Sequence, residues 1–296
     1  MNRAALEAVL DRLAVEAPDA VTRGRVALGR ALGWMEQTSW PEVSWQFSGL
    51  ASGAPVELVW RPGRCGFYWT ADPAAPEMDR ARRFRRGLAV LRANGTGLRQ
   101  ADRRLAARAF AASRTEWPVF LAGRHDAAGD AGKVYLHGGS VPEGFGDLSR
   151  LIAGADAPMM TGVANTGLRE LYWDRQVRQV GDLWRMRQDP ALAPLAGALD
   201  AVLADWTGRG LDGEGRVGLS LTAGPDGQPL ALAAFLRVRQ AGGEAAVRDR
   251  LLRAGGEANP ALAELWRAGR LRPMFLTLGA TADGVQAALG LKLAPG

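Results

Sequence analysis

The sequence predicts an α+β protein built on an antiparallel β-barrel of about ten strands, which come from five hairpins and are ringed by helices. Strand-like segments occur in pairs, each pair closed by a turn rich in Gly, Asp, Asn or Pro. Segments with helical periodicity separate the pairs. Single strands alternating with helices would predict a parallel barrel, whereas hairpins joined by helices predict an antiparallel sheet with helices on one face. The strands lack an edge blocked by Lys or Pro, which favours closure into a barrel.

Helical periodicity predicts helices over residues 3–36 (interrupted at Pro18), 74–94, 98–114, 146–152, 175–188, 192–207, 243–254 and 260–268. Strands are expected over residues 43–50, 55–61, 65–70, 117–123, 132–138, 158–164, 168–173, 216–223, 229–239, 272–279 and 285–293. The turns between paired strands are the strongest local signals. Pro62-Gly63, Asn165-Thr166-Gly167 and Gly224-Pro225-Asp226-Gly227 are three of them.

The composition is that of a globular cytoplasmic protein. The chain has 296 residues, of which 47% are hydrophobic, and no linker divides it, so we expect a single domain over residues 1–296. No apolar run reaches 18 residues, so no membrane span is expected. The charged N-terminal segment excludes a signal peptide, and Cys65, the only cysteine, fits a reducing compartment. We also expect a monomer.

Arginine dominates the basic residues, and the net charge is +6. Only Lys133 and Lys292 are lysines. The arginines cluster in helix-like runs such as residues 79–86, which is typical of a solvated helix face. A nucleic-acid partner is not expected, because no recognition motif accompanies the charge.

Alternation along the strands predicts which side chains face the inside of the barrel. If helices cover the outside, the outward face must be the apolar one, which fixes the register. Val134 and Leu136 then face outward, and Lys133 and Tyr135 face inward. The same rule directs several other polar and aromatic side chains inward: Glu57, Arg61, Tyr68, His137, Glu170, Tyr172, Phe235, Arg237 and Lys292.

Both lysines and all three tyrosines of the chain fall on these inward positions. A barrel of ten strands is too wide for side chains to fill, so it can hold a small molecule. Ammonium groups suit a diphosphate, and aromatic faces stabilise a carbocation. The alternative for Tyr135 and Tyr172 is a cross-strand packing pair, and for Glu57 a solvated edge carboxylate.

Several kinds of site are not indicated by the sequence. It has no glycine-rich phosphate loop, so side chains would have to hold a phosphate. Two histidines, one cysteine and no spaced carboxylate pair give no metal site. A Gly-x-Ser-x-Gly elbow is also missing, which argues against a serine hydrolase.

Three short motifs resemble the aromatic prenyltransferases of the αββα barrel fold, the PT barrel. Pro55-Val56-Glu57-Leu58 is similar to a Pro-x-Glu-Phe segment of the dimethylallyltryptophan synthase branch, and the chain also resembles the bacterial indole and peptide branches. Residues 47–53, followed by Glu57-Leu58, resemble the phenol and hydroxynaphthalene branch. Lys133-Val134-Tyr135-Leu136 matches a Lys-x-Tyr strand motif. In architecture the resemblance covers nearly the whole chain.

The resemblance implies transfer of a dimethylallyl or geranyl group from its diphosphate to an electron-rich acceptor, most simply an indole or tryptophan, free or within a peptide. Glu57 would accept a hydrogen bond from the acceptor and orient it or remove its proton. The implied diphosphate-binding residues are Arg61, Arg64, Lys133, Arg237 and Lys292. The implied shield around the allyl cation is Tyr68, Tyr135 and Tyr172.

Two positions depart from the family pattern. Glu170 stands where a lysine is expected, which weakens diphosphate binding or marks a cationic acceptor, so Glu170 is a candidate for the acceptor side. Val59 replaces the aspartate of the magnesium-dependent members, so we expect no Mg²⁺ requirement and no other cofactor. The alternatives are a non-catalytic barrel that binds an apolar anion, or a phenol or guanidine acceptor.

Overall fold

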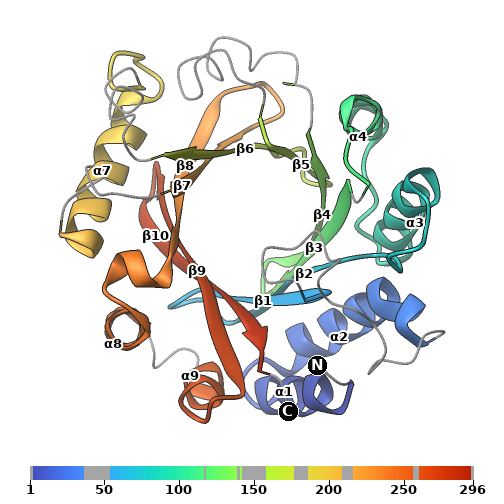
Figure 1. The fold of residues 1–296 in the computed structure, drawn as a ribbon, viewed down its shortest axis with the longest axis horizontal. Helices are drawn as coiled ribbons and strands as arrows, with labels where there is room; N and C mark the ends of the chain where they lie inside the picture. The colour runs from blue at the N-terminus through green and yellow to red at the C-terminus, as the bar shows by residue number, and fades with distance from the viewer. Residues whose placement is uncertain are drawn as a thin grey trace.

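In the computed structural model, ten strands form one closed antiparallel barrel in the order β1-β10-β9-β8-β7-β6-β5-β4-β3-β2. The structure describes residues 3–36, 54–116, 118–138, 141, 158–176, 186–208, 216–255 and 260–294. Viewed down the barrel, the helices lie outside the ring of strands (Figure 1). The predicted fold class is therefore confirmed.

The strands come in five hairpins, as the turn signals predict. They are β1 (Val56–Trp60) with β2 (Gly66–Ala71), β3 (Val119–Asp126) with β4 (Gly129–His137), β5 (Met160–Ala164) with β6 (Arg169–Gln176), β7 (Arg216–Ala223) with β8 (Pro229–Arg237), and β9 (Leu271–Thr281) with β10 (Gly284–Leu293). β3 and β4 are longer than predicted, because residues 127 and 128 alone separate them. The expected strand over residues 43–50, the helix over 146–152 and most of that over 175–188 lie outside the described residues, and residues 175 and 176 belong to β6.

The helices connect the hairpins and cover the barrel. They are α1 (Arg3–Ala14), α2 (Pro18–Leu32), α3 (Arg80–Ala93), α4 (Gln100–Ala112), α7 (Ala193–Thr207), α8 (Glu244–Gly255) and α9 (Pro260–Arg267), with short 3₁₀ turns η1 (Gly33–Glu36) and η5 (Val238–Ala241). The first and last of them meet through an ion pair between Arg12 and Glu264. None of the described helices is long and apolar enough to cross a membrane.

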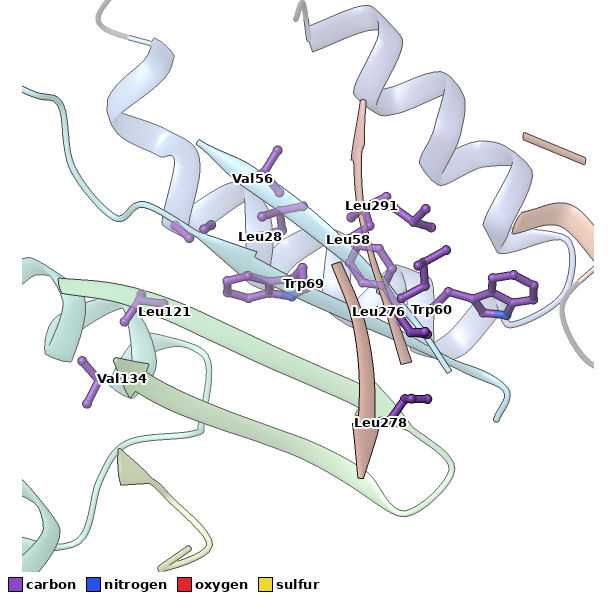
Figure 2. Close-up of a cluster of buried hydrophobic side chains, with 14 of the residues drawn as sticks. Leu28, Val56, Leu58, Trp60, Trp69, Leu121, Val134, Leu276, Leu278 and Leu291 are labelled. Carbon is purple, nitrogen blue, oxygen red and sulfur yellow. The ribbon is translucent and has the colours of Figure 1, made fainter. Parts of the chain in front are cut away.

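The core lies between the barrel and the helices, which confirms the predicted register. Val134, Leu136 and Leu171 are fully buried on the outward face. Figure 2 shows part of this core, where Leu28 of α2 lies with side chains of β1 and β2. Each fully buried side chain of this size contributes roughly 1.5–3 kcal/mol to folding. Inward residues such as Lys133 and Tyr135 alternate with these buried ones and keep part of their surface exposed, so solvent reaches the inside of the barrel.

Helix α2 lies directly on β2 and β3 because Gly24 has no side chain. A Cβ atom at Gly24 would lie 2.1 Å from the ring of Phe67 and 2.9 Å from the ring of His125. Real Cβ atoms are not found this close to other atoms, so the helix would have to move outward. Gly24 therefore sets the distance between this helix and the barrel wall.

The two ends of the barrel differ in the connections that they carry. All five hairpin turns lie at one end, which we call the turn end, because each odd-numbered strand runs toward it and each even-numbered strand leaves it. The connections that carry the helices leave from the opposite end, the helix end. The turn between β1 and β2 contains Gly63 with a positive φ of 72°, a conformation that glycine adopts without strain.

Candidate functional site

Four side chains form a closed ring of polar contacts inside the barrel, which we call the polar ring. Lys133 Nζ lies 2.5 Å from Glu170 Oε1 and 3.3 Å from the hydroxyl of Tyr135. The hydroxyl of Tyr172 donates to the other oxygen of Glu170 and lies 3.5 Å from the hydroxyl of Tyr135. The ring therefore joins strands β4 and β6, which are not hydrogen-bonded to each other.

The strand between them makes this contact possible. On β5, Gly162 is paired with Tyr135 on one side and Glu170 on the other. A Cβ atom at Gly162 would lie 3.2 Å from Cδ of Lys133 and 3.2 Å from Cβ of Glu170. The absence of a side chain at Gly162 therefore leaves the space in which the ion pair forms.

The electrostatics of the polar ring hold a charged pair next to a neutral phenol. Burial disfavours both charges, but their mutual attraction and their hydrogen bonds outweigh it, which raises the pKa of Lys133 and lowers the pKa of Glu170. Burial and the nearby carboxylate raise the pKa of Tyr172 well above its usual value. At neutral pH the ring thus contains an ammonium, a carboxylate and a phenol that donates to the carboxylate.

Aromatic rings from four strands adjoin the polar ring, and we call them the aromatic belt. The belt comprises His137, Phe120, Tyr135, Tyr172 and Phe235. Ring centroids of Phe120 and Tyr135 are 5.6 Å apart, those of Tyr135 and Tyr172 5.7 Å, and those of Tyr172 and Phe235 5.6 Å. His137 lies edge-on to Phe120 at 4.9 Å. Tyr135 and Tyr172 do pack against each other, and the same packing presents several aromatic faces beside one ammonium group.

Tyr68 belongs to a second cluster, near the turn end. Its hydroxyl donates to Asp126 at 3.3 Å, and the guanidinium carbon of Arg61 lies 4.9 Å from its ring centroid. Arg124 Nε is 3.4 Å from the same carboxylate. Burial, helped by Asp126, raises the pKa of Tyr68. Among the described residues no ring contact connects Tyr68 with the aromatic belt.

Glu57 faces the inside of the barrel near the helix end. It is paired with Thr70, which is paired with Ala122, which in turn is paired with Lys133. Glu57 and Lys133 therefore lie on one line across strands β1 to β4. The β1–β10 register, continued one residue beyond the pair of Leu58 and Leu291, brings Lys292 opposite Glu57.

The five cations that the sequence indicates for a diphosphate lie in different parts of the barrel. Arg61 and Arg64 belong to the turn between β1 and β2, at the turn end. Arg237 ends β8 and Lys292 lies one residue from the end of β10, so both are at the helix end. Lys133 lies between these two groups and is paired with Glu170. The five cations therefore do not form one cluster at a single end of the barrel.

No protein-family model and no curated protein matches the chain. Solved structures do match. The 5-dimethylallyl tryptophan synthase from Streptomyces coelicolor, in complex with DMASPP and Trp, superposes with a TM-score of 0.73 at 18% identity over 97% of this chain and 95% of that one. The prenyltransferase PriB, in a ternary complex with L-tryptophan and dimethylallyl thiolodiphosphate, gives 0.68 at 17% identity over 96% and 94%. AnaPT from Neosartorya fischeri gives 0.65 at 12% identity over 97% and 92%. The fold is that of the aromatic prenyltransferases.

Within this prenyltransferase fold, alternation predicts most inward residues but not which of them touch. Phe120 and Arg124 are not among the site residues predicted from the sequence, although placing Val119 and Leu121 on the outward face directs both of them inward. The contact of Lys133 with Glu170 depends on Gly162, which carries no signal in a single sequence. Groups of three or more His, Cys, Asp or Glu suited to a metal are absent from the described part of the chain, and metal independence remains a prediction.

Proposed function

We propose that the protein transfers a dimethylallyl or geranyl group from its diphosphate to an electron-rich aromatic acceptor, with an indole or tryptophan, free or in a peptide, as the first choice. The observation that supports this most strongly is the aromatic belt next to Lys133 inside a barrel of this fold. An allyl cation needs faces that stabilise positive charge and exclude water, and the belt offers them from four strands.

The proposed reaction begins with departure of the diphosphate. The bond between the allyl carbon and oxygen breaks, and both electrons leave with the diphosphate. Lys133 and Arg61 stabilise that charge from the turn-end side, with Arg124 as an additional cation there. The electron-rich ring then attacks the allyl cation, a bond to carbon forms, and the ring loses a proton to restore its aromaticity.

Glu57 is proposed to orient the acceptor and accept its proton. It faces inward near the helix end, away from Arg61 and Arg64 in the β1–β2 turn, and on the same line of paired residues as Lys133. An acceptor held there would have the allyl group between itself and the diphosphate. This arrangement gives the two substrates separate ends of the barrel. It leaves Arg237 and Lys292 near the acceptor rather than near the diphosphate.

The direct test is an activity assay with dimethylallyl and geranyl diphosphate against tryptophan, simple indoles, phenols, arginine derivatives and tryptophan-containing peptides. Mass spectrometry would detect the added prenyl group. Assays with Mg²⁺ and with EDTA test the expected metal independence. Folded protein that gives no product with any acceptor class would overturn the proposal.

One observation favours a second candidate, a non-catalytic barrel that binds an apolar anion. The basic residues are divided between the two ends, and Lys133 is already matched by Glu170. Such a protein would bind a prenyl diphosphate analogue but would not consume the diphosphate itself. Binding without turnover in the same assays would support this candidate over the enzyme.

A further inference from the structure

The polar ring places a carboxylate in direct competition with any anion that approaches Lys133. Lys133 donates one hydrogen bond to Glu170 and one to the hydroxyl of Tyr135. Among the described residues, its third N–H and the O–H of Tyr135 have no acceptor. A phosphate oxygen could accept from both of these donors, but it would bring negative charge close to the carboxylate of Glu170.

Few charged and titratable groups face Glu170 in the part of the chain that the structure describes. Strand β4 contributes Lys133 and Tyr135, and β6 contributes Tyr172. Arg61, in the turn that follows β1, also favours the ionised form of Glu170. The neighbouring strands β5 and β7 place Gly162 and Thr222 opposite it, and neither titrates. The ionised form of Glu170 thus depends mainly on Lys133, which outweighs the cost of burial.

We propose that Glu170 competes with the diphosphate for Lys133, so that diphosphate binding takes up a proton at Glu170 and becomes weaker as the pH rises. This inference rests on the proposed function. A bound diphosphate draws Lys133 toward itself and adds a nearby negative charge, and both effects favour the protonated carboxyl. Because the bound state holds the proton more tightly than the free state, affinity falls with pH across the interval between the two pKa values. After transfer, the same competition favours release of the product diphosphate.

The test is calorimetric titration with inorganic pyrophosphate and with dimethylallyl thiolodiphosphate between about pH 5 and pH 8, in pairs of buffers that differ in ionisation enthalpy. The wild-type protein should take up protons on binding. Pyrophosphate titrates near neutral pH itself, so the decisive quantity is the difference between wild type and Glu170→Gln. The variant should bind about tenfold more tightly or better at the upper end of the range, with a flatter pH dependence.

Asp283→Asn is the matched control. Asp283 lies in the turn between β9 and β10, outside the barrel at the turn end. Its substitution by Asn removes one negative charge, as Glu170→Gln does, without changing a residue of the polar ring. It should leave the affinity and the proton uptake unchanged. A gain equal to that of Glu170→Gln would show a general effect of net charge and overturn the inference.

A second variant keeps the inference testable if Glu170→Gln does not fold. Tyr172→Phe removes a hydrogen bond that favours ionised Glu170, so the pH interval over which affinity changes should move upward. An unmoved interval, or equal affinity and equal proton uptake in Glu170→Gln and wild type, would overturn the inference alone. Absence of binding by both ligands to both proteins would instead count against the proposed function.

Discussion

Lys133 and Glu170 meet across a strand that belongs to neither of them. Their charged atoms are 2.5 Å apart, and Gly162 on the intervening strand β5 leaves the space between them. A methyl group at this inward position would lie 3.2 Å from Cβ of Glu170 and 3.2 Å from Cδ of Lys133, tighter than most real contacts. The ion pair therefore depends on the residue at position 162 as well as on the two charges.

Gly162→Ala should disturb the polar ring. The new methyl group would lie 3.2 Å from both side chains, so Lys133 and Glu170 must move apart or shift together. We expect a loss of roughly 1–3 kcal/mol in the free energy of unfolding, as for other overpacked sites, and weaker binding of dimethylallyl thiolodiphosphate. Chemical denaturation and calorimetry would measure the two effects.

Gly279→Ala is the control for this substitution. Gly279 also faces inward, on β9, but its Cβ would lie 3.5 Å from the side chain of Ala233, an ordinary contact distance. We expect little change in stability or binding. If both alanine variants behave alike, the space at Gly162 has no special role.

The barrel can be predicted from the sequence, because it depends on patterns that a single sequence contains. Strict alternation places Val134 and Leu136 under the helices and Lys133 and Tyr135 inside, and the turn residues define each hairpin. Pairing between strands far apart in the chain is not displayed in this way. The shared cluster of Tyr68 with Asp126, and its separation from Tyr135, follow from the stagger of the strands around a closed barrel, which local patterns do not encode.

The division of the predicted diphosphate-binding cations between the two ends of the barrel could not be predicted from the sequence for a related reason. Arg237 and Lys292 alternate inward as correctly as Lys133 does, but alternation gives the face of a residue and not its height along the barrel. Height depends on where each strand begins and ends, and these boundaries are the least certain part of a sequence-based prediction. A set of inward cations is therefore not yet a binding site.

Gly24→Ala should destabilise the protein through helix α2. The added methyl group would overlap the ring of Phe67 at 2.1 Å, so the helix would be pushed away from the barrel. Overpacking of this kind costs roughly 1–3 kcal/mol or more in the free energy of unfolding. Urea denaturation would measure the loss.

Gly29→Ala supplies the contrast within the same helix. Its Cβ would meet nothing within 4 Å, and alanine is the better helix former, so the variant should gain roughly 0.5–1 kcal/mol of stability. Equal effects at the two glycines would show that propensity, and not the contact with Phe67, decides the outcome.

Glu57→Gln tests the role proposed for the acceptor side. The amide keeps the size of the side chain but accepts a proton poorly, so turnover should fall by about a hundredfold or more. Binding of dimethylallyl thiolodiphosphate should stay within about twofold, because the change lies away from the turn-end cations and leaves Lys133 in place. Unchanged turnover would remove Glu57 from the mechanism, and loss of donor binding would assign it to the diphosphate instead.

The surroundings of His125 favour its neutral form, so we expect the stability of the protein to fall in acid. Its Nε2 accepts a hydrogen bond from Trp69 Nε1 at 3.2 Å, and its Nδ1 lies 3.0 Å from Asp130, which also accepts from Arg23 at 2.8 Å. The neutral ring satisfies both contacts, whereas a proton on Nε2 would face the N–H of Trp69. Burial lowers the pKa of His125 and outweighs the attraction of Asp130 and Asp126.

The direction of the pH dependence follows from comparing proton binding by His125 in the folded and the unfolded states. Below the usual histidine pKa of 6.5 the unfolded chain binds a proton that the folded protein does not, so stability falls as the pH drops through this value. The loss should approach about 1.4 kcal/mol per pH unit until the folded-state pKa is reached. Urea denaturation between about pH 5 and pH 7, above the range in which most carboxylates titrate, would measure this slope.

His125→Gln should flatten the slope in that interval, while His137→Gln, at a partly exposed inward position, should retain it. A wild-type slope that His125→Gln leaves unchanged would mean that another group, and not this buried imidazole, sets the sensitivity to acid.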